Sequence, residues 1–141
     1  VEQALLNLCT NAIHAIGEAR GTVQVDAALA NPDPRQCERL GLSAGNYVAI
    51  SVQDNGPGMD AATQARIFEP FFTTKPVGQG TGLGLSTIYG FARQSGGDAH
   101  IRSVATRGTE VTIMLPATTP VQATRPIFLL VSRDIKSPGR Y

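Results

Sequence analysis

The sequence predicts an α+β fold, a two-layer α/β sandwich in which a mixed, mostly antiparallel sheet carries helices on one face. Two long segments have apolar residues at helical spacing, and four shorter segments alternate between apolar and polar residues. The alternating segments come in two consecutive pairs, and one long helical segment precedes each pair. This order favours hairpin-like strand pairs packed against helices, because parallel strands would need a crossover between them.

We expect helices over residues 1–17, 61–67 and 82–94, and strands over residues 22–29, 47–53, 99–103 and 109–115. Leu6, Cys9 and Ile13 recur at helical spacing in the first helix. Residues 31–46 hold two prolines and two glycines, so we expect a loop there, with Cys37 in it.

Composition excludes several classes of protein. The net charge of +1 and the charged fraction of 16% give no strong attraction to nucleic acid or to an anionic membrane. The sequence has no run of about 18 apolar residues and no signal-peptide pattern. Its two cysteines suggest no disulfide framework, so we expect a reduced, cytoplasmic setting.

We expect one domain over residues 1–116, followed by a linker and tail over residues 117–141 that could lead to a further domain. Residues 116–126 are rich in threonine and proline, as linkers often are. No helix start signal precedes Val1, so the chain is expected to be a fragment of a longer protein.

The first candidate site is a pair of asparagines on the first helix. Asn7 and Asn11 are four residues apart and share one face, with His14 nearby. Amide oxygens suit hard cations such as Mg²⁺. Hydrogen bonds to backbone or solvent would explain the pair equally well.

The second candidate site follows the strand over 47–53. By strand parity Asp54 lies on the same face as Val52, so its carboxylate is aimed between sheet and helices. The exocyclic amine of adenine is a suitable donor for it, and Gly56 and Gly58 would let a base approach the backbone. The same residues also fit an ordinary β-turn.

Two further segments suggest a loop over a ligand. Residues 67–75 hold three of the five phenylalanines, which could anchor a lid or form a small hydrophobic cluster under the loop. Glycines then fall at every second position over residues 78–84, just before a helix, an arrangement that suits anion binding. The run is neither a P-loop nor a good dinucleotide fingerprint. Finally, Thr109 follows Gly108 and faces the same layer as Asp54, although a strand residue after a turn would look alike.

In this order the motifs Asn-x-x-x-Asn, Asp-x-Gly-x-Gly, a phenylalanine-rich segment, Gly-x-Gly-x-Gly and Gly-Thr resemble the N, G1, F, G2 and G3 boxes of sensor histidine kinases. These boxes belong to the ATP-binding catalytic domain of two-component systems, within the Bergerat-fold ATPases. The resemblance covers residues 1–116. Residues 67–75 and 80–86 are most similar to the nitrogen-regulator-like and hybrid subgroup.

The resemblance implies a protein histidine kinase that binds ATP and Mg²⁺ under a mobile lid over residues 55–81. Asn7 and Asn11 would be catalytic, with Asn11 as the Mg²⁺ ligand. Asp54 would accept a hydrogen bond from the adenine amine, and Thr109 would support the base through water. The other implied ATP-binding positions are His14, Gly56, Gly58, Met59, Phe68, Phe72, Lys75, Gly78, Gly80, Thr81, Gly82, Leu83, Gly84 and Leu85.

The implied partners are a histidine-bearing dimerisation domain and a response regulator or receiver domain, and the chain itself would be monomeric. Neither His14 nor His100 has the setting of a helical phosphoacceptor, so we expect no autophosphorylation by this chain alone. Asn7 stands where hydrolysing relatives carry a glutamate base, which disfavours an autonomous ATPase. An ATP-sensing module without transfer, or another Bergerat-fold ATPase, remain the alternatives.

The resemblance also implies that the first strand of the family's sheet is absent before Val1. One sheet edge would then be open. The apolar run over residues 127–131 could cover that edge, exchange with another chain, stay disordered, or begin a receiver domain.

Overall fold

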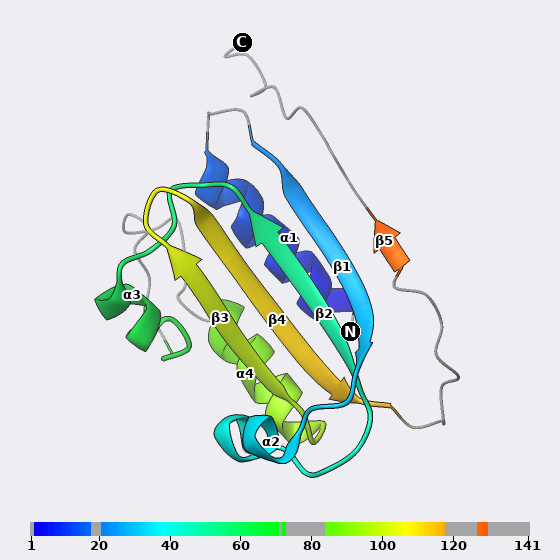
Figure 1. The fold of residues 1–141 in the computed structure, drawn as a ribbon. Coiled ribbons are helices and arrows are strands. Elements are labelled where there is room, and N and C mark those ends of the chain that lie inside the picture. Colours follow the sequence, from blue (N-terminus) through cyan, green and yellow to red (C-terminus); the bar gives the residue numbers. More distant parts are fainter. Residues whose placement is uncertain (1, 18–20, 71, 73–83, 118–126, 130–141) are drawn as a thin grey trace.

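The computed structural model describes residues 2–17, 21–70, 72, 84–117 and 127–129 (Figure 1). The elements are α1 (Glu2–Ile16), β1 (Val23–Ala30), α2 (Pro34–Leu40), β2 (Tyr47–Asp54), α3 (Ala61–Arg66), α4 (Gly84–Gln94), β3 (Asp98–Val104), β4 (Gly108–Pro116) and β5 (Ile127–Leu129). Every predicted helix and strand is present, with its ends shifted by a few residues. Among the described helices, none is long and apolar enough to cross a membrane.

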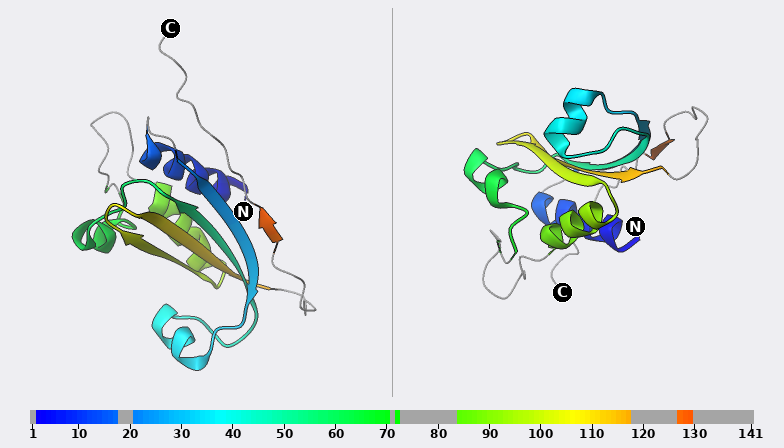
Figure 2. Two further views of the ribbon diagram at one scale, coloured as in Figure 1. Left: turned by 45° about the horizontal axis from the view of Figure 1, so that its top comes forward. Right: turned by 90° about the horizontal axis from the view of Figure 1, so that it is seen from below.

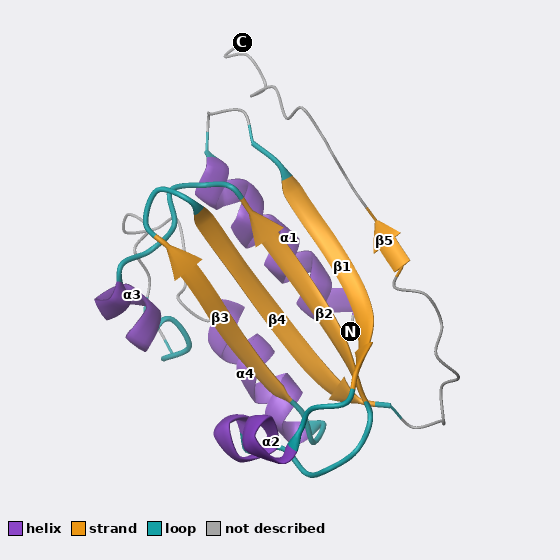
Figure 3. Ribbon diagram, viewed as in Figure 1, coloured by secondary structure: helices purple, strands orange, loops and turns teal. Residues whose placement is uncertain are grey.

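The strands form one five-stranded sheet in the order β3-β4-β2-β1-β5 (Figure 3). All of its strand pairs are antiparallel. Each predicted hairpin pair lies side by side, and β2 and β4 join the two pairs at the centre of the sheet. The predicted α+β sandwich is therefore confirmed.

The two long helices, α1 and α4, cover one face of the sheet (Figure 2). Leu8 of α1 and Ile88 of α4 are 2% and 1% exposed, and they meet Val52 and Ile113 of the sheet in the main core. The alternation in the strands places these residues on the helix-facing side, where burial of apolar side chains stabilises the fold.

Helix α2 corrects the prediction of a loop over residues 31–46. Asp33 caps this helix by accepting a hydrogen bond from the Gln36 N–H at 2.8 Å, and the Gln36 side chain accepts one from the Asp33 N–H at 3.0 Å. Pro34 begins the helix and Gly41 ends it at φ 67°. The prolines and glycines therefore mark the two ends of a helix, and they do not break it.

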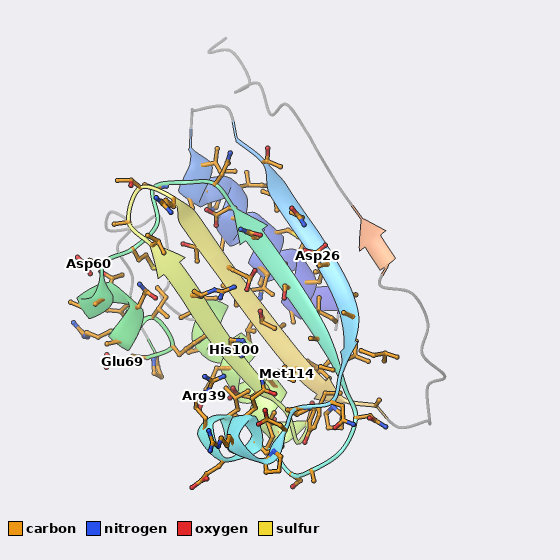
Figure 4. All side chains as sticks on the ribbon, viewed as in Figure 1. Asp26, Arg39, Asp60, Glu69, His100 and Met114 are labelled. Carbon is orange, nitrogen blue, oxygen red and sulfur yellow. The ribbon has the colours of Figure 1, made fainter. Side chains whose placement is uncertain are left out.

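Helix α2 packs on the face of the sheet opposite α1 and α4 (Figure 2). It covers a second cluster that contains Cys37, Leu42, Tyr47 and Met114. The placement of Cys37 in a polar loop was wrong, because its side chain is 8% exposed on this helix. Figure 4 labels Met114 beside α2, at the end of the sheet where the helix packs.

Strand β5 covers the outer edge of β1. Ile127 pairs with Ala27 and Leu129 pairs with Val25, in antiparallel register. Of the roles considered for residues 127–131, covering an open edge is the one that the described part of this run takes. Residues 130 and 131 lie outside the described residues, and the division into a domain over 1–116 and a tail stays a prediction.

Candidate functional site

The centre of the candidate site is Asp54, the last residue of β2. Its side chain is 7% exposed, and its Oδ1 accepts a hydrogen bond from the Gly56 N–H at 2.9 Å. Burial raises the pKa of this carboxyl, while the backbone N–H groups of Gly56 and Thr109 act in the opposite direction. The structure thus holds a hydrogen-bond acceptor at the end of a central strand, between the sheet and the helices.

Glycines allow backbone segments to close around Asp54. Gly108 has a φ of 114°, and a Cβ atom there would clash with the backbone of Asp54. A Cβ atom on Gly56 would lie 3.0 Å from Asp54 Oδ1 and 3.1 Å from the carbonyl oxygen of Ala15. Gly108 is therefore required by close approach, and Gly56 lets the end of α1 lie against the Asp54 side of the site.

The lid predicted over residues 55–81 begins with a crossing over the β3–β4 turn. Gly58 has a φ of 69°, and a Cβ atom there would collide with the carbonyl group of Val104. The Thr106 N–H donates to the Pro57 carbonyl at 2.6 Å. The Met59 N–H donates to Ser103 Oγ at 2.8 Å. The first residues after Asp54 are thus fixed to the sheet.

Helix α1 carries the predicted asparagines toward α4. Asn7 and Asn11 are both half-buried. A Cβ atom built on Gly84 would lie 3.7 Å from Asn11 Nδ2, so the Asn11 amide adjoins the start of α4. Asn7 Oδ1 accepts a hydrogen bond from Gln3 Nε2 at 3.1 Å. His14 is exposed in the last turn of α1.

Aromatic residues attach the predicted lid to α4. Phe68 packs against the main core, and its ring centre lies 5.2 Å from that of Tyr89. Arg66 lies over the Phe72 ring, with its Cζ atom 4.6 Å from the ring centre. These contacts fit an anchored lid and a small hydrophobic cluster under the loop alike, so the role of the phenylalanines stays a prediction.

The described residues bring part of the predicted site together. Asp54, Gly56, Thr109 and the start of the lid meet at one end of the sheet, and Asn11 meets Gly84 beside it. Leu85 packs against the core from the first turn of α4. Six predicted positions fall outside the described residues, namely Lys75, Gly78, Gly80, Thr81, Gly82 and Leu83.

Sequence reasoning missed Ser103 and Gln64, which join the lid to the sheet. Ser103 Oγ lies 2.7 Å from Thr109 Oγ1, and Gln64 Nε2 donates to the Ser103 carbonyl at 2.8 Å. A signal for Ser103 was present, since it continues the inward-facing alternation of Ala99 and Ile101. Its importance depends on the register that places it opposite Thr109.

The site offers two kinds of chemistry. The Asp54 end presents acceptors, which suit a ligand edge rich in N–H donors. The Asn11 end presents a neutral amide, which suits a hard cation shared with oxygens of a ligand. No group of three His, Cys, Asp or Glu side chains that could hold a metal ion occurs among the described residues.

Comparison with known proteins identifies the family of this chain. Residues 1–119 match the family of histidine kinase-, DNA gyrase B-, and HSP90-like ATPases, and the chain belongs to that family. The predicted resemblance to its histidine kinase branch is confirmed by the relatives below, while the subgroup stays a prediction.

The sensor kinase CckA of Brucella abortus (strain 2308) is 40% identical over 115 residues, which are 82% of this chain. These residues span 12% of that protein's length. The catalytic domain of histidine kinase ThkA has a TM-score of 0.60 at 31% identity, covering 82% of this chain and 64% of that chain. Full-length ShkA in complex with AMPPNP has a TM-score of 0.58 at 30% identity, covering 84% of this chain and 22% of that chain.

Proposed function

We propose that this chain is the ATP-binding catalytic module of a sensor histidine kinase, and that it transfers the γ-phosphate of ATP to a histidine on a separate dimerisation domain. The observation that carries the proposal is the buried Asp54 carboxylate, held at the end of β2 by the Gly56 N–H. Adenine presents an exocyclic amine, which is the donor that such an acceptor needs. The similarity to ShkA, whose structure contains the ATP analogue AMPPNP, supports ATP as the nucleotide.

The proposed roles follow the two ends of the site. Asp54 accepts from the adenine amine, Thr109 supports the base through water, and the segment from Gly56 to Met59 forms the wall of the base pocket. Asn11 supplies an amide oxygen near the start of α4, where the phosphates would lie. Lys75 and the glycines over residues 78–84 are proposed to contact the phosphates.

Mg²⁺ bound with ATP would neutralise charge on the phosphates during phosphoryl transfer. In that step this chain would hold the phosphates in line with an incoming acceptor. Asn11 would orient the phosphates through the cation that is bound to them. Asn7 lies one turn away and has a neutral amide, which cannot take a proton from water. This supports transfer to a partner over independent hydrolysis.

The proposed partners are the histidine-bearing dimerisation domain and, after it, a response regulator or receiver domain. We propose a cytoplasmic setting for this module, including the case in which the whole sensor is anchored in a membrane. The chain on its own is proposed to be monomeric.

Transfer in trans tests the function. The chain is mixed with a histidine-bearing dimerisation domain of a sensor kinase, Mg²⁺ and ATP labelled at the γ-phosphate. Label is expected on the dimerisation domain in an acid-labile form, and none is expected when its acceptor histidine is replaced by glutamine. Tight ATP binding without transfer would instead favour an ATP-sensing module. Release of phosphate by the chain alone would favour a hydrolysing ATPase.

Two variants of α1 sharpen this test. Asn11→Ala is expected to lower the transfer rate at least about 100-fold, since it removes a group that stabilises charge in the transition state. Thr10→Ala changes the neighbouring, exposed residue of the same helix and is expected to leave the rate within about twofold. Equal rates for the two variants would contradict the role of Asn11.

A further inference from the structure

Ser103 has a position and hydrogen-bond partners that the roles proposed for the site residues do not explain. It lies on β3 directly opposite Thr109 of β4, and Thr109 in turn lies opposite Asp54 of β2. The three polar residues thus form one row across three strands, on the face that carries α1 and α4. Ser103 is 9% exposed, so its hydroxyl group must find its partners inside the protein.

Three hydrogen bonds use the full capacity of the Ser103 hydroxyl, which has one proton and two lone pairs. The Gly108 carbonyl, 3.0 Å away, can only accept, so Ser103 donates its proton there. The Met59 N–H, 2.8 Å away, can only donate, so it takes one lone pair. Thr109 Oγ1 is 2.7 Å from Ser103 Oγ and must therefore donate its own proton to the second lone pair.

This arrangement fixes the polarity of Thr109. With its proton directed at Ser103, the Thr109 hydroxyl can only accept hydrogen bonds from the nucleotide site. Asp54 beside it is an acceptor as well. Two adjacent acceptors favour a ligand edge, or a bridging water, that points hydrogens at them, and they oppose a carbonyl oxygen in the same place.

We propose that Ser103 is a positioning residue that makes the site select adenine over guanine by holding Thr109 as an acceptor. The inference deepens the proposed function and rests on it for the site of the base. Adenine presents an exocyclic amine where guanine presents a carbonyl oxygen. A Thr109 hydroxyl released from Ser103 could rotate and donate to that oxygen, so discrimination between the two bases would fall.

Ser103 also takes part in the hydrogen bonds that hold the start of the lid. The test must therefore separate loosening of the lid from a change in the polarity of the Thr109 hydroxyl. Gln64 of α3 donates to the Met59 carbonyl at 3.2 Å and to the Ser103 carbonyl at 2.8 Å, and it accepts from the Ser103 N–H at 3.2 Å. A loosened lid is expected to weaken the binding of ATP and of GTP together. The ratio of the GTP and ATP dissociation constants therefore separates a change in base discrimination from a general loss of nucleotide affinity.

The experiment measures displacement of a fluorescent ATP analogue from the full chain by ATP and by GTP. Ser103→Ala is expected to lower the GTP-to-ATP ratio of dissociation constants about fivefold, the effect of one hydrogen bond. Ser103→Thr keeps a hydroxyl and is expected to keep the wild-type ratio. Ser103→Cys has nearly the same size with a weakly bonding thiol, so it is expected to behave like alanine even if Ser103→Ala does not fold.

Ser51→Ala is the matched control. Ser51 Oγ lies 2.9 Å from Thr112 Oγ1, which makes the same kind of cross-strand hydroxyl pair on the opposite face of the sheet. This variant is expected to leave the ratio unchanged. A wild-type ratio in both Ser103→Ala and Ser103→Cys, with ATP still bound, would overturn the role of Ser103 and leave the proposed function standing. A wild-type chain that binds no ATP would overturn both, and ATP binding without transfer to histidine would overturn the kinase function alone.

Discussion

Asp54 and Thr109 lie opposite each other at adjoining ends of β2 and β4, so a nearly buried carboxylate faces a threonine in the helix-facing layer. Burial raises the pKa of Asp54, which means that the fold disfavours the ionised form. An ionised carboxylate is nevertheless what the proposed base recognition requires. The structure thus carries a group that costs stability, and binding of a donor ligand would offset that cost.

Asp54→Asn is therefore expected to stabilise the fold and to impair binding. The asparagine oxygen can still accept from the Gly56 N–H, while the charge is removed. We expect a gain on the order of 1 kcal/mol in the free energy of unfolding at neutral pH. We also expect ATP affinity to fall at least about tenfold, since the amide presents a donor or a weaker acceptor to adenine. Urea unfolding and ATP titration check the two effects, and a variant that binds ATP as well as wild type would contradict the role of Asp54.

The advantage of Asp54→Asn should depend on pH. Because the folded pKa of Asp54 lies above the unfolded value, the cost of the charge is absent below the unfolded value of about 4. The cost grows as the pH rises from the unfolded value toward the folded pKa, and it is complete above the folded pKa. The stability difference between variant and wild type is thus expected to grow from acid toward neutral pH. A difference that shrinks over this range would show that burial of Asp54 does not disfavour its charge.

Gly58→Ala is expected to disturb the start of the lid. The backbone at Gly58 has a φ of 69°, and a Cβ atom would collide with Val104, so we expect a loss of about 1–3 kcal/mol in stability and weaker ATP binding. Gly90→Ala is the matched control, because Gly90 lies within α4 and a Cβ atom there meets nothing within 4 Å. It is expected to gain about 0.5–1 kcal/mol. Equal effects of the two substitutions in urea unfolding would contradict the close approach at Gly58.

Arg93 joins α4 to α2 at the other end of the sheet. Its Nη1 donates to the Leu40 carbonyl at 3.0 Å and lies 3.5 Å from Oδ1 of Asp98, whose side chain is 8% exposed. Burial raises the pKa of Asp98, and Arg93 counteracts this rise. Arg93→Ala leaves a buried acid without its cation, so we expect a loss of about 1–3 kcal/mol.

Two controls distinguish the stability lost with the ion pair from the stability lost by shortening any arginine side chain. Arg102→Ala removes the exposed partner of Glu110, at 3.4 Å, and is expected to change stability by less than about 0.5 kcal/mol. Asp98→Asn is expected to recover part of the loss when it is combined with Arg93→Ala, since it removes the unpaired charge. A double variant as unstable as Arg93→Ala alone would place the cost in the lost hydrogen bonds to the backbone carbonyls of Leu40, Gly41 and Gly97.

The sequence predicted the parts of this molecule that depend on local periodicity. The alternation in the strands reflects which face of the sheet is buried, and a single segment records that. The stripe of Leu6, Cys9 and Ile13 does not mark the buried face of α1, because Leu6 and Ile13 are 60% and 42% exposed and α1 contributes Ala4, Leu8 and Ala12 to the core. Helix α2 was not predicted because proline and glycine are typical of loops, although Asp33 and Gln36 carry a capping signal. Ser103 could not be assigned a role, because its meaning depends on a register between strands that no local pattern fixes.

Strand β5 protects the outer edge of β1. Ile127–Leu129 pairs with β1 at Val25, Asp26 and Ala27, and this pairing satisfies backbone groups that would otherwise face solvent. A chain ending at Ala117 would present this edge to other copies, so we expect it to self-associate as its concentration rises, while the full chain stays monomeric. Sedimentation velocity over a concentration series checks this. Ala28 is exposed on β1, and Ala28→Lys in the shortened chain is expected to reduce the association by placing charge on the open edge. A shortened chain that remains monomeric throughout would show that β5 is not needed to protect β1.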